Sequence, residues 1–566
     1  MLESARSRIS DWNPQLVREI KGRWKGRNLI IAIGASLFSQ LMVYLGFNSQ
    51  LPSQYERNNR YCMGTPPEGS LSPSQFHNPP SDYCLKAGGE INWQLWWLDL
   101  FTFLSIASLI FLLVLGTYLL ISNLSQEQQR GTLKFIRLSP RSVGEVLWGK
   151  ILGVPILVYF AFALTLPLQF LAGIAAGIPM SLILGFYVVT IASCAFFYSL
   201  ALLYGLVTTA LGNFQASLGT GIIFCFLLFA TIAGTTNDLV NHNTLDWLVL
   251  FYPGKILPYL IGETPHSLGT ISYFNLKDMA SLTWYSFPLW EKAGSAIALM
   301  ILNYTWWTYW AWQGLKRRFH NPQATLLSKQ QSYWVTGSVT VSLLGFMYFQ
   351  QEESPYKLLS NFQQFLALEL LVFLLLIAAL SPHRQTLQDW ARYRYQKTDQ
   401  ATRNLFTDLA KGEQSPANGA IALNLLSNII IMLPALIAFP LNGKLLEVFG
   451  VILLTSSAFL IAACLVQWVL LMKTSKRSLF AVTTLASVML IPPMIESILG
   501  FRPSVSLLFF PIPNINQLTL TSIGFSLLAQ WVILFACNWQ LTRQLKKAGE
   551  SNSKALFSEQ KSLSKV

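Results

Sequence analysis

The stretch "LDLFTFLSIASLIFLLVLGTYLLI", residues 98–121, decides the fold class, because it is almost wholly apolar and holds one charged side chain, Asp99. A helix needs roughly 20 apolar residues to cross the hydrocarbon core of a membrane. The apolar residues are continuous rather than alternating, which is typical of a helix and excludes a barrel strand. The stretch is therefore predicted to span a membrane as a helix.

Similar apolar runs recur along the whole chain of 566 residues. The twelve predicted spans are about 29–47, 98–121, 151–174, 180–211, 217–236, 293–312, 334–350, 359–380, 425–440, 447–472, 478–499 and 521–541. Only 12% of residues are charged, whereas a soluble domain usually carries about 25%. The polar stretches between the spans are short, so the chain has little room for a soluble catalytic domain.

The distribution of basic residues predicts that both termini are cytoplasmic. If the N-terminus lies inside and twelve spans alternate, 31 of the 40 Lys and Arg residues fall on the inner side. This bias follows the positive-inside rule. The net charge of +14 is then explained by the anionic inner leaflet, and no nucleic acid partner is expected. No cleavage site follows the first apolar run, so we expect that helix to be retained.

Two pairs of matching segments indicate an internal duplication. "WQGLKRRFHNPQATLLSKQQS" (312–332) closes the sixth span, and "WQLTRQLKKAGESNSKALFSEQKS" (539–562) closes the twelfth. "FYPGKILPYL" (251–260) and "FFPIPNINQL" (509–518) precede the same two spans. Because six spans preserve orientation, the halves would be parallel. The predicted fold is an all-α integral membrane protein with about 12 transmembrane helices in two parallel six-helix repeats.

Three regions follow from this organisation. Residues 1–28 are predicted to be an amphipathic interfacial segment, 29–330 the first transmembrane half, and 331–566 a divergent second half with a cytoplasmic tail. Within 11–28, the apolar side chains share one side if the segment is helical, which suits a helix lying along the inner membrane surface. These apolar residues are Leu16, Val17, Ile20 and Trp24. The alternative is a solvated basic tail.

Two of the six cysteines, Cys62 and Cys84, lie in the loop 48–93, which the predicted topology places outside. Two cysteines in one loop on the oxidising side predict a disulfide. The alternative is a pair of free thiols. The other four lie within apolar runs, where a thiol behaves as a small apolar group.

Residues 138–153, "LSPRSVGEVLWGKILG", contain the pattern G-x-x-x-x-G-K at Gly144, Gly149 and Lys150. A phosphate-binding P-loop also needs Ser or Thr after the lysine and a strand before the first glycine. Here Ile151 follows the lysine, and the segment leads into a membrane span. We therefore expect no nucleotide to bind this chain, and Lys150 to anchor the third span at the membrane surface.

The wider segment 125–153, "SQEQQRGTLKFIRLSPRSVGEVLWGKILG", resembles the permease subunits of bacterial ABC-2 type ATP-binding-cassette exporters. In that family this loop connects the second and third spans. The matching residues are Glu127, Gly131, Thr132, Leu133, Leu138, Ser139, Pro140, Gly149 and Lys150. The resemblance extends over the first 330 residues.

The resemblance implies a fold with a short cytoplasmic coupling helix from Glu127 to Leu133 that docks on a separate ATPase. The residues implied in coupling are Glu127, Arg130, Gly131, Thr132, Leu133, Ser139 and Pro140. Cytoplasmic ATP-binding-cassette ATPase subunits and membrane lipid are then the partners, with ATP and Mg²⁺ bound by the ATPase and no cofactor on this chain. The location would be the bacterial plasma membrane, and the substrate an amphipathic or lipid-like molecule.

The second half departs from this pattern in its corresponding loop, 381–424. The Gly-Thr-Leu triplet is missing, so an asymmetric transporter is the expectation. Four residues nevertheless repeat the order of Arg130, Leu133, Ser139 and Pro140. These second-half coupling candidates are Arg403, Leu405, Ser415 and Pro416.

One acid, Glu369, lies near the middle of the eighth span. A carboxylate inside a membrane is costly and is a functional candidate by default. It would suit a proton relay, a contact to a cationic substrate, or a partner for an internal arginine. The rival hypothesis is therefore an ion-gradient-driven secondary transporter with Glu369 as its proton site. A non-transporting scaffold is the third alternative.

The sequence contains no recognisable enzyme site. The five histidines are scattered without metal-ligand spacing, and no Ser-His-Asp arrangement can be placed. Neither catalytic residues nor a metal site are therefore expected. The polar residues Gln40, Asn303, Asn428 and Gln530 within spans are interpreted as contacts between helices.

Overall fold

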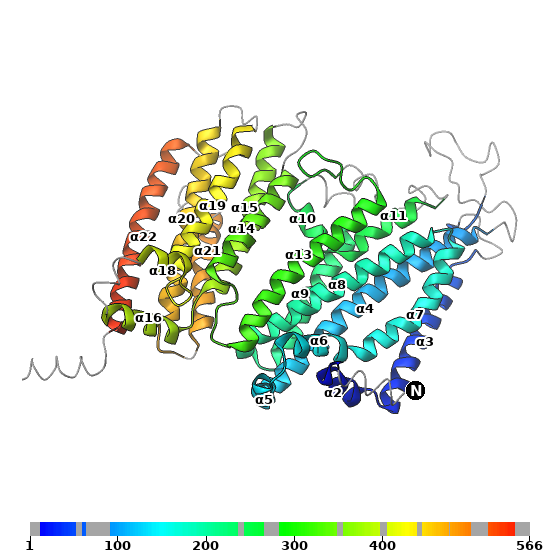
Figure 1. Ribbon diagram of the computed structural model, residues 1–566. Coiled ribbons are helices and arrows are strands. Elements are labelled where there is room, and N and C mark those ends of the chain that lie inside the picture. Colours follow the sequence, from blue (N-terminus) through cyan, green and yellow to red (C-terminus); the bar gives the residue numbers. More distant parts are fainter. Residues whose placement is uncertain are drawn as a thin grey trace, which may run out of the picture. The chain divides into compact units, whose positions relative to one another are not determined.

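A computed structural model describes residues 12–52, 59–63, 91–235, 243–264, 282–347, 355–396, 405–438, 444–474, 476–499 and 519–549. Within these ranges the regular elements are helices, and the only β-type pairings are two isolated bridges. Ten helices in the described ranges are long and apolar enough to cross a membrane. The protein is therefore an α-helical, multi-pass integral membrane protein (Figure 1).

The chain divides into two compact units. The first consists of Met1–Asn241, Leu248–Leu282 and Pro288–Phe319, and the second of His242–Trp247, Thr283–Phe287 and His320–Val566. The predicted boundary at residue 330 lies just inside the second unit, next to the first residue of its first long helix.

The described residues of the first unit form six long helices and several short ones. The long helices are α3 (Gly26–Asn48), α4 (Trp93–Gln129), α7 (Ile156–Ala175), α8 (Met180–Val207), α9 (Phe214–Thr235) and α13 (Ala293–His320). The short helices that precede α7 are α2 (Pro14–Arg23), α5 (Thr132–Leu138) and α6 (Val143–Gly153). Between α8 and α13 lie η1 (Thr209–Leu211), η2 (Pro253–Ile256) and α11 (Leu257–Gly262), and also α10 (Asp246–Val249), whose first two residues belong to the second unit.

In the second unit, the part of the chain that the structure describes also forms six long helices. They are α14 (Lys329–Met347), α15 (Pro355–Leu380), α19 (Asn418–Ala438), α20 (Leu445–Leu470), α21 (Arg477–Leu499) and α22 (Leu520–Gly549). Two shorter helices, α16 (Arg384–Gln396) and α18 (Leu405–Lys411), connect the second long helix to the third. They run across the ends of the long helices of this unit (Figure 1).

Each of the twelve predicted spans coincides with one of these twelve long helices. The ten candidate membrane helices exclude α13 and α14, which are 28 and 19 residues long but less apolar. The third predicted span, 151–174, begins within α6 and breaks at Val154-Pro155 before α7. A proline removes a backbone donor and clashes with the preceding turn, which explains the break.

Helix α4 forms the centre of the first unit, where it packs against α7, α8 and α9. The close approach of α4 to α8 depends on Gly116 of α4, since a Cβ at this position would overlap the ring of Tyr198 on α8. The Tyr198 hydroxyl donates to the carbonyl of Leu112 on α4 at 2.7 Å. The Gln169 side chain of α7 donates to the hydroxyl of Ser108 on α4 at 2.8 Å. Small residues and paired polar groups thus tie these helices together within the membrane.

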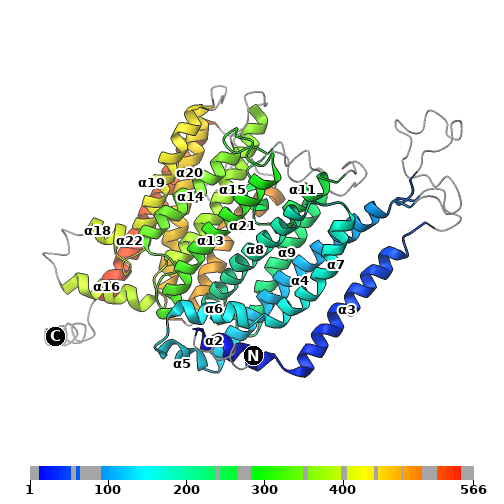
Figure 2. The ribbon, with the colours of Figure 1, turned by 45° about the vertical axis from the view of Figure 1, so that its right-hand side comes forward.

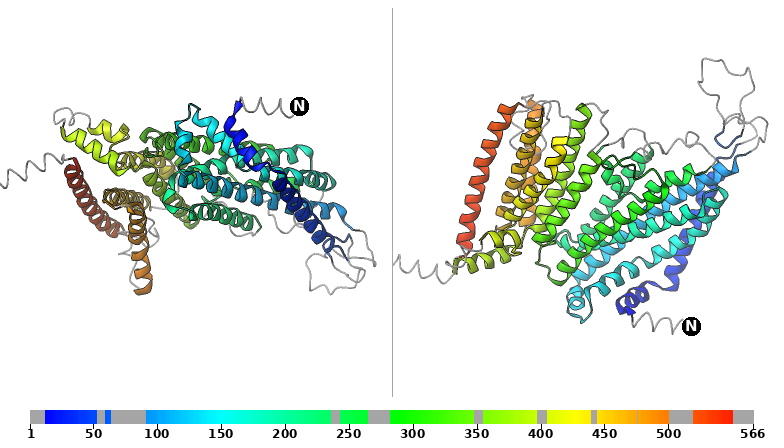
Figure 3. Two further views of the ribbon diagram at one scale, coloured as in Figure 1. Left: turned by 90° about the horizontal axis from the view of Figure 1, so that it is seen from below. Right: turned by 45° about the horizontal axis from the view of Figure 1, so that its top comes forward.

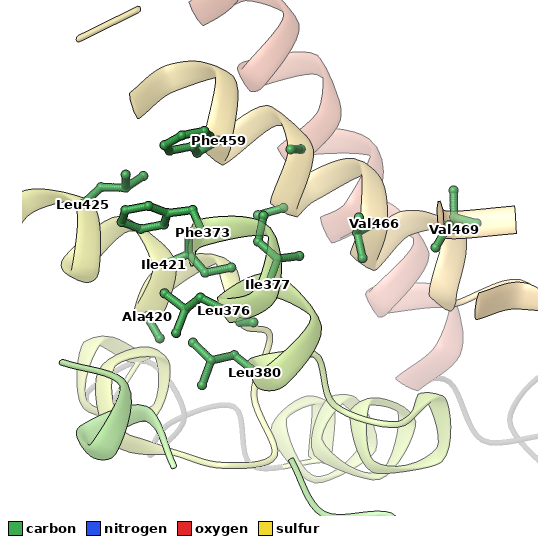
Figure 4. Packing of buried hydrophobic residues seen from close by; sticks show 14 residues of the cluster. Phe373, Leu376, Ile377, Leu380, Ala420, Ile421, Leu425, Phe459, Val466 and Val469 are labelled. Carbon is green, nitrogen blue, oxygen red and sulfur yellow. The ribbon is translucent and has the colours of Figure 1, made fainter. Parts of the chain in front are cut away.

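The core of the second unit is built around α15, α19 and α20 (Figure 4). The rings of Phe373 and Phe459 stack with centroids 5.0 Å apart. Leu376, Ile377 and Ile421 pack around them as buried side chains. Closely packed apolar side chains from three helices give this unit its own core.

The interpretation of polar residues as contacts between helices is confirmed for Gln40, Asn428 and Gln530, whereas Asn303 donates to the carbonyl of Leu250, between α10 and η2, at 3.5 Å. Gln40 of α3 donates to the carbonyl of Leu164 on α7 at 3.3 Å. Asn428 of α19 donates to Glu369 of α15, and Ser457 of α20 donates to Gln530 of α22.

Candidate functional site

Helix α2 is held at its start by Asn13. The side-chain oxygen of Asn13 accepts from the backbone N–H of Leu16 at 3.0 Å, and Pro14 occupies the first turn. Asn is a favoured cap and Pro a favoured first residue, because neither leaves a helical hydrogen bond unmade. The Asn13 amide also donates to the carbonyl of Glu145 in α6 at 2.7 Å. One residue therefore starts α2 and attaches it to α6.

Gly149 and Gly153 form the surface of α6 on which α2 packs. A Cβ on Gly149 would lie 2.9 Å from the backbone nitrogen of Leu16, and a Cβ on Gly153 would lie 2.6 Å from the Cβ of Glu19. Residues four apart share one helix face, and small residues there let two backbones approach closely. Gly149 of the P-loop-like pattern thus serves helix packing, together with Gly153 one turn later.

Lys150 lies between these glycines and is completely buried, with 0% exposure of its side chain. Its Nζ lies 2.7 Å from Oε2 of Glu127, at the end of α4, and 3.7 Å from Oε1 of Glu19, in α2. It also donates to Oδ1 of Asn123 at 2.9 Å. The expectation that Lys150 anchors the chain at the membrane surface is wrong, because two carboxylates and an amide bind its ammonium inside the protein.

Two arginines on α2 complete this cluster, which we call the lysine junction: Glu19, Asn123, Glu127 and Lys150 with Arg18 and Arg23. Arg18 lies 3.3 Å from Glu127, and Arg23 bonds to Glu19 one turn away. Gln15 donates to the same Glu19 carboxylate at 2.9 Å. Each buried carboxylate therefore has a cation and a further donor, as buried charges require.

The predicted coupling segment folds differently from the expectation at its start. Glu127 belongs to the last turn of α4, is buried, and does not begin a separate helix. Arg130 ends α4 as an exposed residue, and Gly131 turns the chain with φ of +73°, a conformation that favours glycine. The short helix is α5, seven residues from Thr132 to Leu138.

The other residues of the predicted coupling segment hold α5 in place. Thr132 Oγ1 lies 3.3 Å from the carbonyl of Glu127 and donates to it, and Leu133 is buried. Ser139 has extended backbone that ends α5, and Pro140 follows it. Ser142 then caps α6 by accepting from the N–H of Glu145 at 3.2 Å. A glycine turn and a Ser-Pro turn therefore fix both ends of α5.

The free side of α5 exposes large apolar side chains. Phe135 is 76% and Leu138 82% exposed, and the neighbouring Lys134 is exposed as well. Arg137 is placed on the opposite side over the ring of Phe319, 5.6 Å from its centroid. Burial lowers the pKa of the Arg137 guanidinium from its ordinary value. Exposed apolar residues on a polar end of a protein are typical of an interaction surface.

The second-half candidates lie around α18, except Arg403, which is outside the described residues. Leu405 begins α18 and is exposed, whereas Ser415 and Pro416 are buried. Leu405 and Pro416 line a cavity of about 610 Å³, together with Arg394 and Lys546. Phe406 of α18 is exposed in the same manner as Phe135 of α5.

A second buried lysine, Lys329, holds the loop after α18. Its Nζ donates to Ser415 Oγ at 2.5 Å and to the carbonyls of Leu409 and Pro416 at 2.9 and 3.0 Å. Burial lowers the pKa of Lys329 to about 8, against an opposing effect from Asp408. Lys329 is the first residue of α14 and precedes the predicted span. Each unit thus uses a buried ammonium to fix the segment between its second and third long helices.

Glu369 is buried in the second unit, with 4% exposure. Its carboxylate accepts from the hydroxyl of Thr340 on α14 at 3.1 Å and from the amide of Asn428 on α19. In the part of the chain that the structure describes, no Lys or Arg forms an ion pair with it. The carboxylate therefore joins three helices through neutral donors, and the hypothesis of an internal arginine partner finds no support among these residues.

The opposite end of α4 carries another buried acid. Asp99 accepts two bonds from the Arg60 guanidinium, at 2.8 and 3.1 Å, and one from the Tyr61 hydroxyl at 3.1 Å. Burial, together with Asp99, raises the pKa of Tyr61 well above its ordinary value. The adjacent Cys62 is disulfide-bonded, and Cys84 lies outside the described residues. The pairing of these two cysteines stays a prediction.

The sequence interpretation missed Glu19, Asn123, Arg60 and Asp99 as parts of this framework. Glu19 had a detectable pattern: it lies three residues after Leu16 and therefore on the side of α2 that packs. Arg60 and Asp99 are 39 residues apart, and no local spacing connects them.

Comparison with known proteins adds no assignment: no family model, curated protein or solved structure matches the chain.

Proposed function

We propose that this chain is the membrane permease of an ATP-binding-cassette transporter of the ABC-2 type, driven by a separate cytoplasmic ATPase. The observation that carries the proposal is that α5 is held by a turn at each end and exposes apolar side chains. An exposed apolar surface of Phe135 and Leu138 stands on a segment fixed at both ends. Such a surface fits a groove on a partner protein, and it is otherwise costly to expose.

The lysine junction connects this surface to the membrane helices. Lys150 lies on α6, Glu127 on α4 and Glu19 on α2, so a displacement of α5 is transmitted to all three helices together. Closely packed helices move as bodies rather than deform, because their interiors are densely packed. ATP binding and hydrolysis on the partner would therefore tilt α4 and the α6–α7 pair.

The internal organisation of the two units is consistent with two parallel six-helix repeats. Each unit has six long helices within its described ranges, and short helices separate the second from the third. In each, the first long helix packs against the third: α3 against α7, and α14 against α19. The third long helix also contains an internal proline in both units, at Pro167 and Pro434.

Purification of the tagged full chain from its native membranes tests the proposal. Wild type should retain an ATPase whose activity is inhibited by vanadate, and Phe135→Ser with Leu138→Ser should lose it. Phe406→Ser is the matched control, because Phe406 is equally exposed on α18. Absence of an ATPase from wild type, or its retention by the α5 variant, contradicts the proposal.

The second candidate function is an ion-gradient-driven transporter, and the burial of Glu369 favours it. Among the described residues, Thr340 and Asn428 are the donors to this carboxylate, which can therefore take up a proton without losing an ion pair to any of them. Glu369→Gln keeps the size of the side chain and removes the ionisable group. Under our proposal, the carboxylate of Glu369 has a structural role inside the span, so this variant keeps ATP hydrolysis by the purified complex within about twofold of wild type. Transport abolished by an uncoupler and by Glu369→Gln would favour the rival.

A further inference from the structure

A cavity of about 750 Å³ lies among α3, α4 and α7 of the first unit. This volume falls within the range of about 300–1,000 Å³ that is usual for ligand sites. Its wall includes Ala35 and Gln40 from α3, Ala107 and Phe111 from α4, and Phe162 from α7. All three helices are candidate membrane spans, so the cavity lies at the level of lipid chains.

Helix α3 is weakly covered by protein along this cavity. Ser36 is its one buried residue, and α3 lies at the edge of the first unit beside α7 (Figure 2). The two further views in Figure 3 show the same edge position of the dark blue helix. The side of α3 that faces the cavity is therefore accessible to whatever occupies the surrounding membrane.

The wall requires an apolar occupant, because its polar side chains already bond within the protein. Ser36 donates to the carbonyl of Ala161 at 3.0 Å, and Gln40 donates to the carbonyl of Leu164 at 3.3 Å. Ser108 accepts from Gln169 at 2.8 Å. A ligand with hydrogen-bonding groups would have to displace these bonds, whereas a hydrocarbon chain would not.

The end of the cavity at the start of α3 is basic. Asn28 lines the cavity there, and Lys25 and Arg27 flank it as exposed side chains. In the described part of the chain, neither cation forms an ion pair with an acid. Cations at the level of lipid headgroups attract anionic lipids.

We propose that this cavity binds one anionic phospholipid, with an acyl chain between α3, α4 and α7 and its phosphate beside Lys25 and Arg27. The lipid fills space that α3 leaves open against α4 and joins α3 to the rest of the unit. The inference does not depend on the source of energy for transport, because it rests on the first unit's own cavity and charges.

Native mass spectrometry of the detergent-purified full chain tests the acyl-chain contact. After partial delipidation, the protein is incubated with dioleoyl phosphatidylglycerol or dioleoyl phosphatidylcholine. Wild type should retain one phosphatidylglycerol, and Ala35→Trp should reduce its occupancy about tenfold, since a large ring then fills the cavity. Leu37→Trp, on an exposed part of the same helix, should bind as wild type does. Equal occupancy in Ala35→Trp and wild type overturns the proposal.

The headgroup contact is tested with exposed residues, so this arm does not depend on how Ala35→Trp folds. Lys25→Gln with Arg27→Gln should weaken phosphatidylglycerol binding about thirtyfold and leave phosphatidylcholine binding unchanged. Lys546→Gln with Lys547→Gln supplies a matched pair of exposed cations and should have no effect. Equal retention of the two lipids by wild type overturns the proposed anionic site.

Discussion

Lys150 and Glu127 meet at 2.7 Å across the base of the segment that carries α5. Glu127 lies on α4, which leads into this segment, and Lys150 lies on α6, which follows it. Their ion pair therefore joins the two ends of the segment. The G-x-x-x-x-G-K pattern therefore has a role in holding the segment that carries α5, and its lysine binds carboxylates of the same chain.

Replacing one member of this pair should destabilise the protein strongly. Lys150→Met leaves Glu127 and Glu19 without their shared ammonium, and loss of one partner of a buried ion pair costs about 3–5 kcal/mol. Lys150→Met with Glu127→Leu should recover part of this loss. Thermal unfolding in detergent measures both. Arg141→Ala, which breaks the exposed Arg141–Glu145 pair, is the control and should cost less than about 1 kcal/mol.

Gly149→Ala should loosen α2 from α6. Its Cβ would lie 2.9 Å from the Leu16 backbone nitrogen, so α2 must move, at a cost of about 1–3 kcal/mol. Gly144→Ala on the same helix has no neighbour closer than 4.0 Å and should be neutral or stabilising. Limited proteolysis before α3 reports the release of α2. Equal protection in the two variants would contradict the role of Gly149.

Lys329 should make stability depend on alkaline pH. Its pKa is about 8 in the folded protein, below its ordinary value of 10.5, so between these limits the unfolded state binds more protons. Stability contributed by this residue therefore rises as pH increases from 8 toward 10.5. The difference in melting temperature between wild type and Lys329→Met, measured across this range, should grow in favour of wild type. A constant difference would show that the ammonium does not titrate there.

The predicted bond between Cys62 and Cys84 also reports membrane topology. In intact cells, a membrane-impermeant maleimide should leave wild type unlabelled at this loop until a reductant is added. Cys84→Ser should free Cys62 and permit labelling from outside, in a background where Cys225 and Cys537 are replaced by Ser. Labelling of Cys62 only after the membrane is permeabilised would reverse the predicted orientation.

The fold was predictable because each span depends on local composition. Twelve apolar runs gave twelve long helices, and the exceptions at α13 and α14 concern how apolar a helix is, not whether it forms. Pro155 was the local reason for the break between α6 and α7, and it is visible in the sequence. The arrangement of two repeats stays a prediction supported by the similar order of elements.

The site was less predictable because it depends on contacts between distant segments. Gly131, Ser139 and Pro140 were recognisable since turn residues act locally. Lys150 was placed wrongly, because its partners Glu127 and Glu19 come from two other helices. A lysine beside an apolar run has the same sequence pattern whether it reaches the membrane surface or a buried acid, and only tertiary structure distinguishes these cases.

The order of residues in the lysine junction has a consequence for biogenesis. Glu19 is synthesised first, Glu127 next, and Lys150 last, so α2 and α4 are made before the ammonium that neutralises their carboxylates exists. Until α6 emerges from the ribosome, these carboxylates must remain hydrated or be bound by Arg18 and Arg23. Completion of α6 is thus the step at which the nascent chain can form the lysine junction. Chains truncated before Lys150 should therefore be selective targets of membrane quality control.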